Sequence, residues 1–168
     1  PLPGLDDVGY LTSDTLWGLR EQPKRLVVLG GGPIGCELAQ SFARLGSQVT
    51  QIEMLPRIMI REDEEVSAFS RKALEHDGVT VLTGHKALRC EVKDGAKTIV
   101  VESGGAERAI EFDVLLCAAG RSEVGLGRPD ARPWAYARRD SLSRICATWC
   151  LVCTRVNRRQ ARTSSPAK

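Results

Sequence analysis

The sequence of 168 residues lacks any long apolar run and has only two histidines. No segment approaches the roughly 20 apolar residues of a membrane helix, so we expect no membrane partner. The N-terminus has neither a basic leader nor an apolar stretch, and we expect no signal peptide. No initiator methionine is present, so we expect a chain that starts inside a longer protein.

The catalytic groups of a self-sufficient dehydrogenase are also absent. The sequence has no Tyr-x3-Lys pair, and neither His76 nor His85 has an evident catalytic partner. Such an enzyme needs a general acid or base beside its cofactor. The sequence therefore argues against a single-domain dehydrogenase, and we assign no catalytic residue.

The six cysteines form neither a disulfide framework nor a complete metal site. Zinc sites usually have four ligands, and the cluster near the C-terminus lacks a fourth: Cys146, Cys150 and Cys153. Three others lie in apolar surroundings and should be small buried side chains: Cys36, Cys90 and Cys117. We predict no metal site and a reducing, cytoplasmic location.

Charge divides the sequence at about residue 120. Residues 1–120 contain 13 Lys and Arg against 18 Asp and Glu, whereas residues 121–168 contain 11 against 3. The net charge of +3 therefore comes from the last quarter alone. This excludes an argument for nucleic-acid binding by the whole chain. The Arg-rich end lacks aromatic or helical organisation, so we expect no nucleic-acid partner.

An apolar run at residues 25–29 leads into a glycine cluster and then into a helical pattern. The run is typical of a central parallel strand, and Pro33 suits the first position of a helix. Gly46 should end this helix, whose expected apolar face is Ile34, Leu38, Phe42 and Leu45. Residues 49–52 follow as a strand, with Glu53 at its C-terminal end. The pattern predicts a β-α-β unit.

A second helix and further strands follow. Asp63 is a candidate N-cap, Gly78 should end the helix, and its expected inner face is Val66, Phe69, Ala73 and Leu74. Residues 79–82 should form a third parallel strand. Hairpin signals separate short strands at residues 85–92, 97–102 and 108–112, and residues 114–119 should rejoin the parallel sheet. We predict an α/β fold: a Rossmann-like parallel sheet, a small antiparallel meander and an irregular tail.

The glycine turn at residues 30–35 has the spacing of a dinucleotide-binding motif. Gly30 permits a tight bend, Gly32 lets the backbone approach a pyrophosphate, and Gly35 lets the helix pack against the sheet. Free N–H groups at the helix N-terminus then face the phosphates. Glu53, 21 residues after Gly32, is placed to accept hydrogen bonds from the adenosine ribose. We predict that this unit binds a dinucleotide.

Glu53 also affects the choice of cofactor. Its carboxylate repels a 2′-phosphate, which favours NAD over NADP. Arg57 and Arg61 could soften that preference or could be solvated loop charges. Glu37 also has two interpretations: a carboxylate on the first turn that interacts with the helix dipole, or a group near the nicotinamide.

Four segments carry a family resemblance: TSDTL at 12–16, LVVLGGGPIGCE at 26–37, VTQIE at 49–53 and DVLLCAAGR at 113–121. They resemble the pyridine nucleotide–disulfide oxidoreductases, in particular the dihydrolipoamide dehydrogenase and mercuric reductase-like bacterial members. The resemblance implies the central domain of a dimeric flavoprotein, which binds NAD or NADP and presents it to FAD.

The resemblance also implies roles for individual residues. Glu37 matches a glutamate beside the nicotinamide and flavin, and Glu53 matches the ribose-binding acid. Gly120 matches a glycine that lines the cofactor, and Ala87 matches a backbone position over the adenosine. Pro33 stands where some members place an aromatic lid over the nicotinamide pocket. Together with the turn, the candidate binding set is Gly30, Gly31, Gly32, Pro33, Ile34, Gly35, Glu37, Glu53, Met54, Ala87 and Gly120.

Other family features are missing from the sequence. It has no FAD-binding glycine motif or C-x4-C redox pair upstream, and no Gly-Asp flavin motif, His-Glu pair or dimerisation domain downstream. FAD is therefore expected only in a full-length enzyme. We predict a connector from a missing FAD domain at 1–25, where Thr12, Ser13 and Asp14 cap a short helix. An NAD(P)-binding domain follows at 26–121, then an aberrant or disordered basic tail at 122–168.

Two alternatives stay open at this point. The tail is either a frameshifted continuation or a genuine extension. The chain is either the NAD(P)H-binding domain of an FAD-dependent disulfide oxidoreductase or a stand-alone, non-catalytic dinucleotide-binding module.

Overall fold

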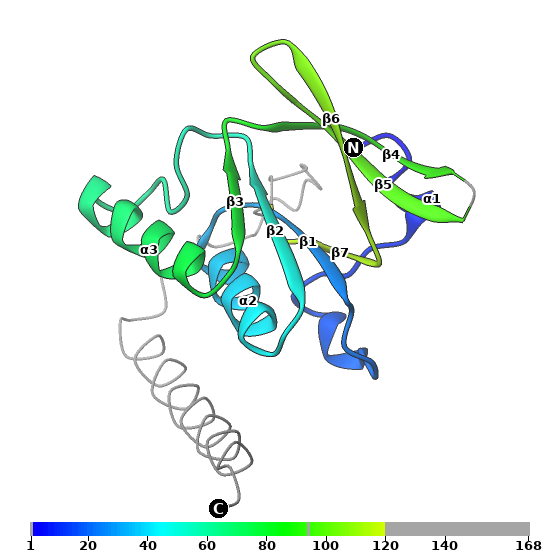
Figure 1. Ribbon diagram of the computed structural model, residues 1–168, viewed down its shortest axis with the longest axis horizontal. Coiled ribbons are helices and arrows are strands. Elements are labelled where there is room, and N and C mark those ends of the chain that lie inside the picture. The colour runs from blue at the N-terminus through cyan, green and yellow to red at the C-terminus, as the bar shows by residue number, and fades with distance from the viewer. Residues whose placement is uncertain (1, 94, 120–168) are drawn as a thin grey trace, which may run out of the picture. The chain divides into compact units, whose positions relative to one another are not determined.

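Two sheets form the framework of the computed structural model, which describes residues 2–93 and 95–119. Four parallel strands lie in the order β3-β2-β1-β7 (Figure 1): β1 Arg25–Leu29, β2 Gln48–Glu53, β3 Thr80–Thr83 and β7 Val114–Cys117. An antiparallel meander forms the second sheet: β4 Lys86–Lys93, β5 Ala96–Ser103 and β6 Ala106–Phe112. The predicted fold class is confirmed, with strand ends that differ by one or two residues. The predicted irregular tail lies outside the described residues.

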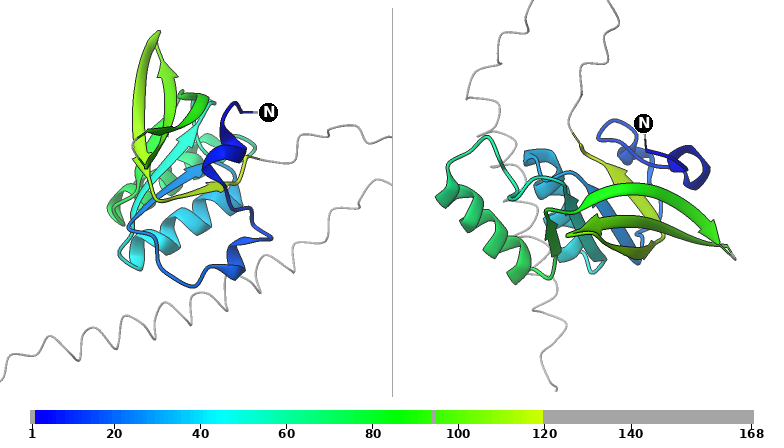
Figure 2. Two further views of the ribbon diagram at one scale, coloured as in Figure 1. Left: turned by 90° about the vertical axis from the view of Figure 1, so that its right-hand side faces the viewer. Right: turned by 90° about the horizontal axis from the view of Figure 1, so that it is seen from above.

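The parallel sheet separates two apolar cores. The right-hand view of Figure 2 shows α2 (Pro33–Arg44) and α3 (Glu64–His76) on one side of this sheet and the meander on the other. Alternate residues of β1 divide between the cores, because successive side chains of a strand point to opposite faces. Leu26 and Val28 pack with α2 and α3, whereas Val27 packs with the meander residues Ile99 and Val101. Burial on both faces explains the uninterrupted apolar run of β1.

The buried faces of both helices agree only in part with the predicted ones: Leu38 and Leu74 are buried as expected, whereas other predicted residues are exposed. On α2, Ile34 and Leu45 are exposed, and the buried residues are Gly35, Cys36, Leu38 and Ala39. Small residues at 35 and 39 let the helix lie close to the sheet, which turns Ile34 outwards. On α3, Phe69 is 75% exposed and Val66 is also exposed, whereas Ser67 and Leu74 are buried. Within residues 2–93 and 95–119, no helix is long and apolar enough to cross a membrane.

The N-terminal segment packs against the sheet. It contains α1 (Leu5–Val8) and a single 3-10 turn, η1 (Leu16–Gly18). Leu11 pairs with β7, since its N–H donates to the Leu115 carbonyl at 2.8 Å. The helix predicted after residues 12–14 is only this 3-10 turn, and no side chain caps it. The Thr12 hydroxyl instead accepts from the N–H groups of Asp14 and Thr15. The domain boundary at residue 26 stays a prediction.

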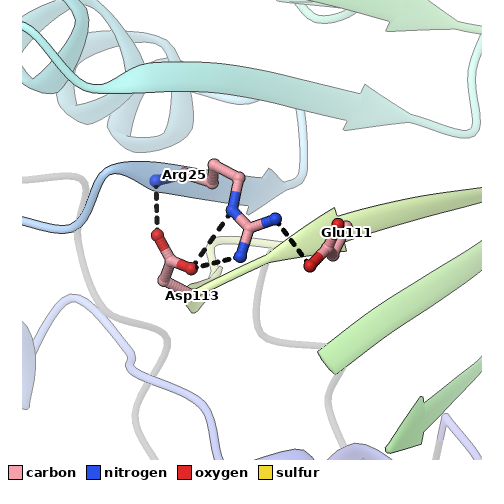
Figure 3. Close-up of polar contacts among 3 residues, drawn as sticks. All are labelled: Arg25, Glu111 and Asp113. Carbon is pink, nitrogen blue, oxygen red and sulfur yellow. Dashed lines mark hydrogen bonds and ion pairs between the residues drawn. The ribbon is translucent and has the colours of Figure 1, made fainter. Parts of the chain in front are cut away.

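An ion-pair cluster joins Arg25 of β1 to Glu111 of β6 and to Asp113, which lies between β6 and β7 (Figure 3). The Arg25 guanidinium donates to Asp113 Oδ1 at 2.7 and 3.1 Å and lies 2.6 Å from Glu111 Oε1. The Arg25 backbone N–H donates to Asp113 Oδ2 at 2.8 Å, and the Asp113 N–H donates to the Arg25 carbonyl. These hydrogen bonds from Arg25 lower the pKa of the Asp113 carboxyl. The cluster fixes the start of β1 beside the start of β7.

Asp113→Asn should therefore destabilise the protein in a pH-dependent way. Because the folded pKa of Asp113 is depressed, its contribution is present above the unfolded pKa of about 3.9 and is lost as the pH falls through the folded value. Urea titrations at several pH values should show a stability difference from wild type at pH 7 that shrinks below about pH 4. Asp14→Asn, at an exposed carboxyl, is the control. A constant difference between wild type and Asp113→Asn from pH 7 to pH 3 would contradict this account.

Candidate functional site

The carboxyl ends of three parallel strands meet beside the glycine turn. From β1 the chain runs to β2 and β3 on one side, whereas β7 lies on the other side of β1. In open α/β sheets, ligands bind in the crevice at such a reversal of strand order. The Gly30 N–H donates to the Ile52 carbonyl, and the Ala118 N–H donates to the Leu29 carbonyl, each at 2.8 Å. The turn is thus fixed to both neighbouring strands.

Three glycines of the turn are required by close packing. Gly30 has φ +119°, and a Cβ there would lie 2.6 Å from the Ala118 carbonyl oxygen. A Cβ on Gly31 would lie 2.8 Å from Glu53 Oε2 and 2.9 Å from the Ile58 side chain. A Cβ on Gly35 would collide with the Gly30 carbonyl oxygen. These positions therefore serve the fold itself.

Gly32 differs from the other three, because among residues 2–93 and 95–119 no atom outside its two chain neighbours lies within 4 Å of the position that its Cβ would occupy. Gly32 is the N-cap of α2, and no side chain caps the helix there. The first N–H groups of a helix have no partner within the helix, and they attract anions. Since Pro33 has no N–H, the donors available beyond Gly32 come from Ile34 and Gly35. The turn thus presents open space and N–H donors at one place.

The Glu53 carboxylate lies against the turn. Its Oε2 accepts from the Gly31 N–H at 2.5 Å, and its Oε1 accepts from the Leu55 N–H at 2.8 Å. A carboxylate offers about four acceptor positions, so acceptor capacity remains for other donors. The Glu53 carbonyl also accepts from the His85 N–H at 3.0 Å, which brings the start of β4 to the same end of the sheet.

Residues 54–63, here called the 54–63 loop, close one side of the turn. Ile58 is fully buried and faces Gly31. The Met59 N–H donates to the Gly31 carbonyl at 2.7 Å, and the Ser67 hydroxyl donates to the Ile58 carbonyl at 2.7 Å. Between the ends of this segment, the sequence drew attention only to the charges of Arg57 and Arg61. Its contacts show that it supports the turn.

Gln51 is a second supporting residue that the sequence did not reveal. It is fully buried under the turn, and its Nε2 donates to the Gly30 carbonyl at 3.0 Å and to Cys36 Sγ at 3.5 Å. Its Oε1 has no partner among the residues that the structure describes. One signal was available: Gln51 lies between Val49 and Ile52 in a strand expected inside the parallel sheet, where a polar side chain needs a buried partner. Cys36 is buried in the apolar core, as predicted, and this burial raises the pKa of its thiol. Cys90 is also buried, and Cys117 is half-buried.

The other candidate residues take different positions around the turn. Glu37 is exposed in the second turn of α2, not in the first turn as expected, because the helix begins at Pro33. Ile34 is exposed one helical turn before it. Met54 is exposed beyond the end of β2, and Ala87 is half-buried in β4 at a β-bulge. Gly120 and the cysteines of the tail lie outside the described residues.

The titratable groups do not assemble into a metal centre in the part of the chain that the structure describes. No group of three His, Cys, Asp or Glu side chains is placed to hold a metal ion among residues 2–93 and 95–119. The chemistry of the site therefore rests on N–H donors, one carboxylate and open space.

Comparison with known proteins links this arrangement to one family. The profile of the pyridine nucleotide-disulphide oxidoreductases matches residues 1–130. A mercuric reductase from Bacillus cereus is 43% identical over 123 residues, which are 73% of this chain and 20% of that protein. A dihydrolipoyl dehydrogenase from Thermus scotoductus is 46% identical over 101 residues, which are 59% of this chain and 22% of that protein. The chain thus spans about a fifth of these relatives.

A solved structure shares the fold. The HOCl-induced flavoprotein disulfide reductase RclA from Escherichia coli superposes with a TM-score of 0.63 and 32% sequence identity. The match covers 71% of this chain and 27% of that chain.

The unequal roles of the glycines predict unequal effects of alanine substitutions on stability. Gly30→Ala should lower the free energy of unfolding by about 2–4 kcal/mol, because it adds backbone strain and a clash with Ala118. Gly32→Ala should cost less than about 1 kcal/mol, because only the weaker N-cap propensity of alanine acts against it. Chemical denaturation of the two variants measures both values. Equal losses of stability would show that Gly32 is also required by packing.

Proposed function

This chain belongs to the pyridine nucleotide-disulphide oxidoreductase family, and on that premise we propose that residues 26–121 bind the nicotinamide cofactor of an FAD-dependent enzyme. A nicotinamide bound here would serve as the hydride donor for a flavin held elsewhere in the full-length enzyme. The task of this chain is to bind and orient the dinucleotide. FAD binding, dimerisation and reduction of the final acceptor belong, in this proposal, to the full-length enzyme.

One observation carries the proposal: the open space at Gly32 lies at the uncapped N-terminus of α2. A pyrophosphate placed there would receive hydrogen bonds from the N–H groups of Ile34 and Gly35 and would meet the positive end of the helix dipole. The neighbouring positions 30, 31 and 35 have no such space. The opening is therefore confined to the position where the backbone must approach the phosphates.

Glu53 orients the adenosine end in this proposal. Two backbone N–H groups hold its carboxylate, and the remaining acceptor positions would receive the ribose hydroxyls. Met54 and Ala87 lie toward the same end of the sheet and would flank the adenosine. The exposed side chains of Ile34 and Glu37 lie farther along α2 and would flank the nicotinamide. NAD is favoured over NADP, because a 2′-phosphate would add negative charge beside Glu53.

Gly32→Ala separates dinucleotide binding from folding. The added methyl group would occupy the space of the pyrophosphate and should raise the Kd for NADH at least about tenfold, while the protein stays folded. Calorimetric titration of the chain with NADH, NADPH and FAD measures this. Gly18→Ala is the matched control, because Gly18 also has open space at its Cβ position and no positive φ. Heat from FAD alone, or equal NADH affinity in wild type and Gly32→Ala, would refute the proposed site.

Glu53→Gln tests the selectivity for NAD. The substitution keeps the shape of the side chain and removes its charge, so the ratio of the Kd for NADPH to that for NADH should fall about tenfold. Glu65→Gln, at an exposed carboxylate in the first turn of α3, controls for the change in net charge. An unchanged ratio in Glu53→Gln would mean that this carboxylate does not face the 2′ position.

A further inference from the structure

Arg57 lies at the centre of the 54–63 loop and uses its side chain within that loop. Its Nη1 donates to the Glu62 carbonyl at 2.8 Å and makes a long contact of 3.5 Å with the Met59 carbonyl. Its Nη2 donates to the Ile60 carbonyl at 3.2 Å. A planar guanidinium can serve several acceptors at once because its donors lie in a fixed fork. Arg57 thus folds the loop around its own side chain.

The folded loop includes a strained residue. Met59 has φ +52°, the only positive value among the described residues other than glycine. Such a conformation is strained and persists only where the surroundings enforce it. Here the Met59 N–H donates to the Gly31 carbonyl and its own carbonyl faces Arg57. The strain is held where the loop meets the glycine turn.

The loop also fixes the Glu53 carboxylate. Leu55, at the start of the loop, donates its N–H to Glu53 Oε1, whereas Gly31 donates to Oε2. Ile58 packs against Gly31 on the inner side. Displacement of the loop would therefore remove support from both the acid and the turn.

We propose that Arg57 is a positioning residue for dinucleotide binding, which acts through the 54–63 loop on Gly31 and Glu53 and does not bind a 2′-phosphate. This inference rests on the proposed function. In this proposal the 54–63 loop forms one preformed side of the binding site, beside the adenosine ribose. Because the Arg57 guanidinium donates to loop carbonyls, it should support the binding of NAD and NADP equally. Both cofactors would contact Gly31 and Glu53, which the loop holds.

The first test compares cofactor affinities in Arg57→Gln and Arg57→Lys. Arg57→Gln should raise the Kd for NADH, NADPH and ADP-ribose by a similar factor of about ten, because the acid and the turn lose their common support. Arg57→Lys should restore only part of the affinity, since an ammonium cannot span the same carbonyls. Arg108→Gln, at an exposed site on β6, is the charge-matched control. Weaker binding of NADPH alone would identify Arg57 as a phosphate ligand and overturn the proposal, as would unchanged affinity for all three ligands.

The second test needs no cofactor. Amide hydrogen exchange in the free protein should show loss of protection at Met59 and Leu55 in Arg57→Gln and retained protection in β1. Unchanged protection at Met59 and Leu55 would overturn the positioning role, whatever the affinities are. A third outcome separates the two proposals. If the wild-type chain binds none of the three ligands, the proposed function is refuted. If Arg57→Gln nevertheless loses protection at Met59 and Leu55, the role of Arg57 in ordering the loop is still supported.

Discussion

The lack of a Cβ atom at Gly30 and Gly31 determines how the candidate site is built. At Gly30 and Gly31 the backbone lies against the Ala118 carbonyl, the Glu53 carboxylate and the Ile58 side chain, with no room for a Cβ. Contacts this close bring β7, β2 and the 54–63 loop to one point at the end of β1. Overlap in a packed interior is costly, so a side chain at either position would push these segments apart. The strand order places the turn between β2 and β7, and the two glycines let these segments meet there.

Much of this arrangement was predictable because it depends on local rules. The apolar strand, the glycine spacing and Pro33 at the helix start predicted β1, the turn and α2. Hairpin signals predicted the meander, and Gly104 and Gly105 both have the positive φ that a tight hairpin favours. These features depend on the backbone conformations that glycine and proline favour and on the apolar pattern within one segment. Both can be read directly from a single sequence.

The support behind the turn was not predictable, because it depends on contacts between distant segments. Apolar spacing on α3 favoured Val66 and Phe69 as inner residues, yet Ser67 is buried and donates to the Ile58 carbonyl. An analysis of apolar periodicity considers only apolar side chains. It therefore could not predict that the Ser67 hydroxyl would bind the 54–63 loop. Arg57 was open to two interpretations for a similar reason: its sequence neighbours do not reveal that three loop carbonyls surround its guanidinium.

The same supporting contacts bear on how a ligand could bind. Ordering a site at the moment of binding costs free energy, and a preformed site avoids that cost. Glu53 is held by two N–H groups, Gly31 by Glu53 and Met59, and Gly30 by Gln51. None of these contacts uses the space at Gly32 or the first N–H groups of α2. In the part of the chain that the structure describes, a dinucleotide bound as proposed would therefore leave these hydrogen bonds of the turn in place. Among the described residues the buried Oε1 of Gln51 has no partner, and a buried acceptor without a hydrogen bond costs free energy. The Gln51 side chain thus supports the Gly30 carbonyl at some cost to the stability of the fold.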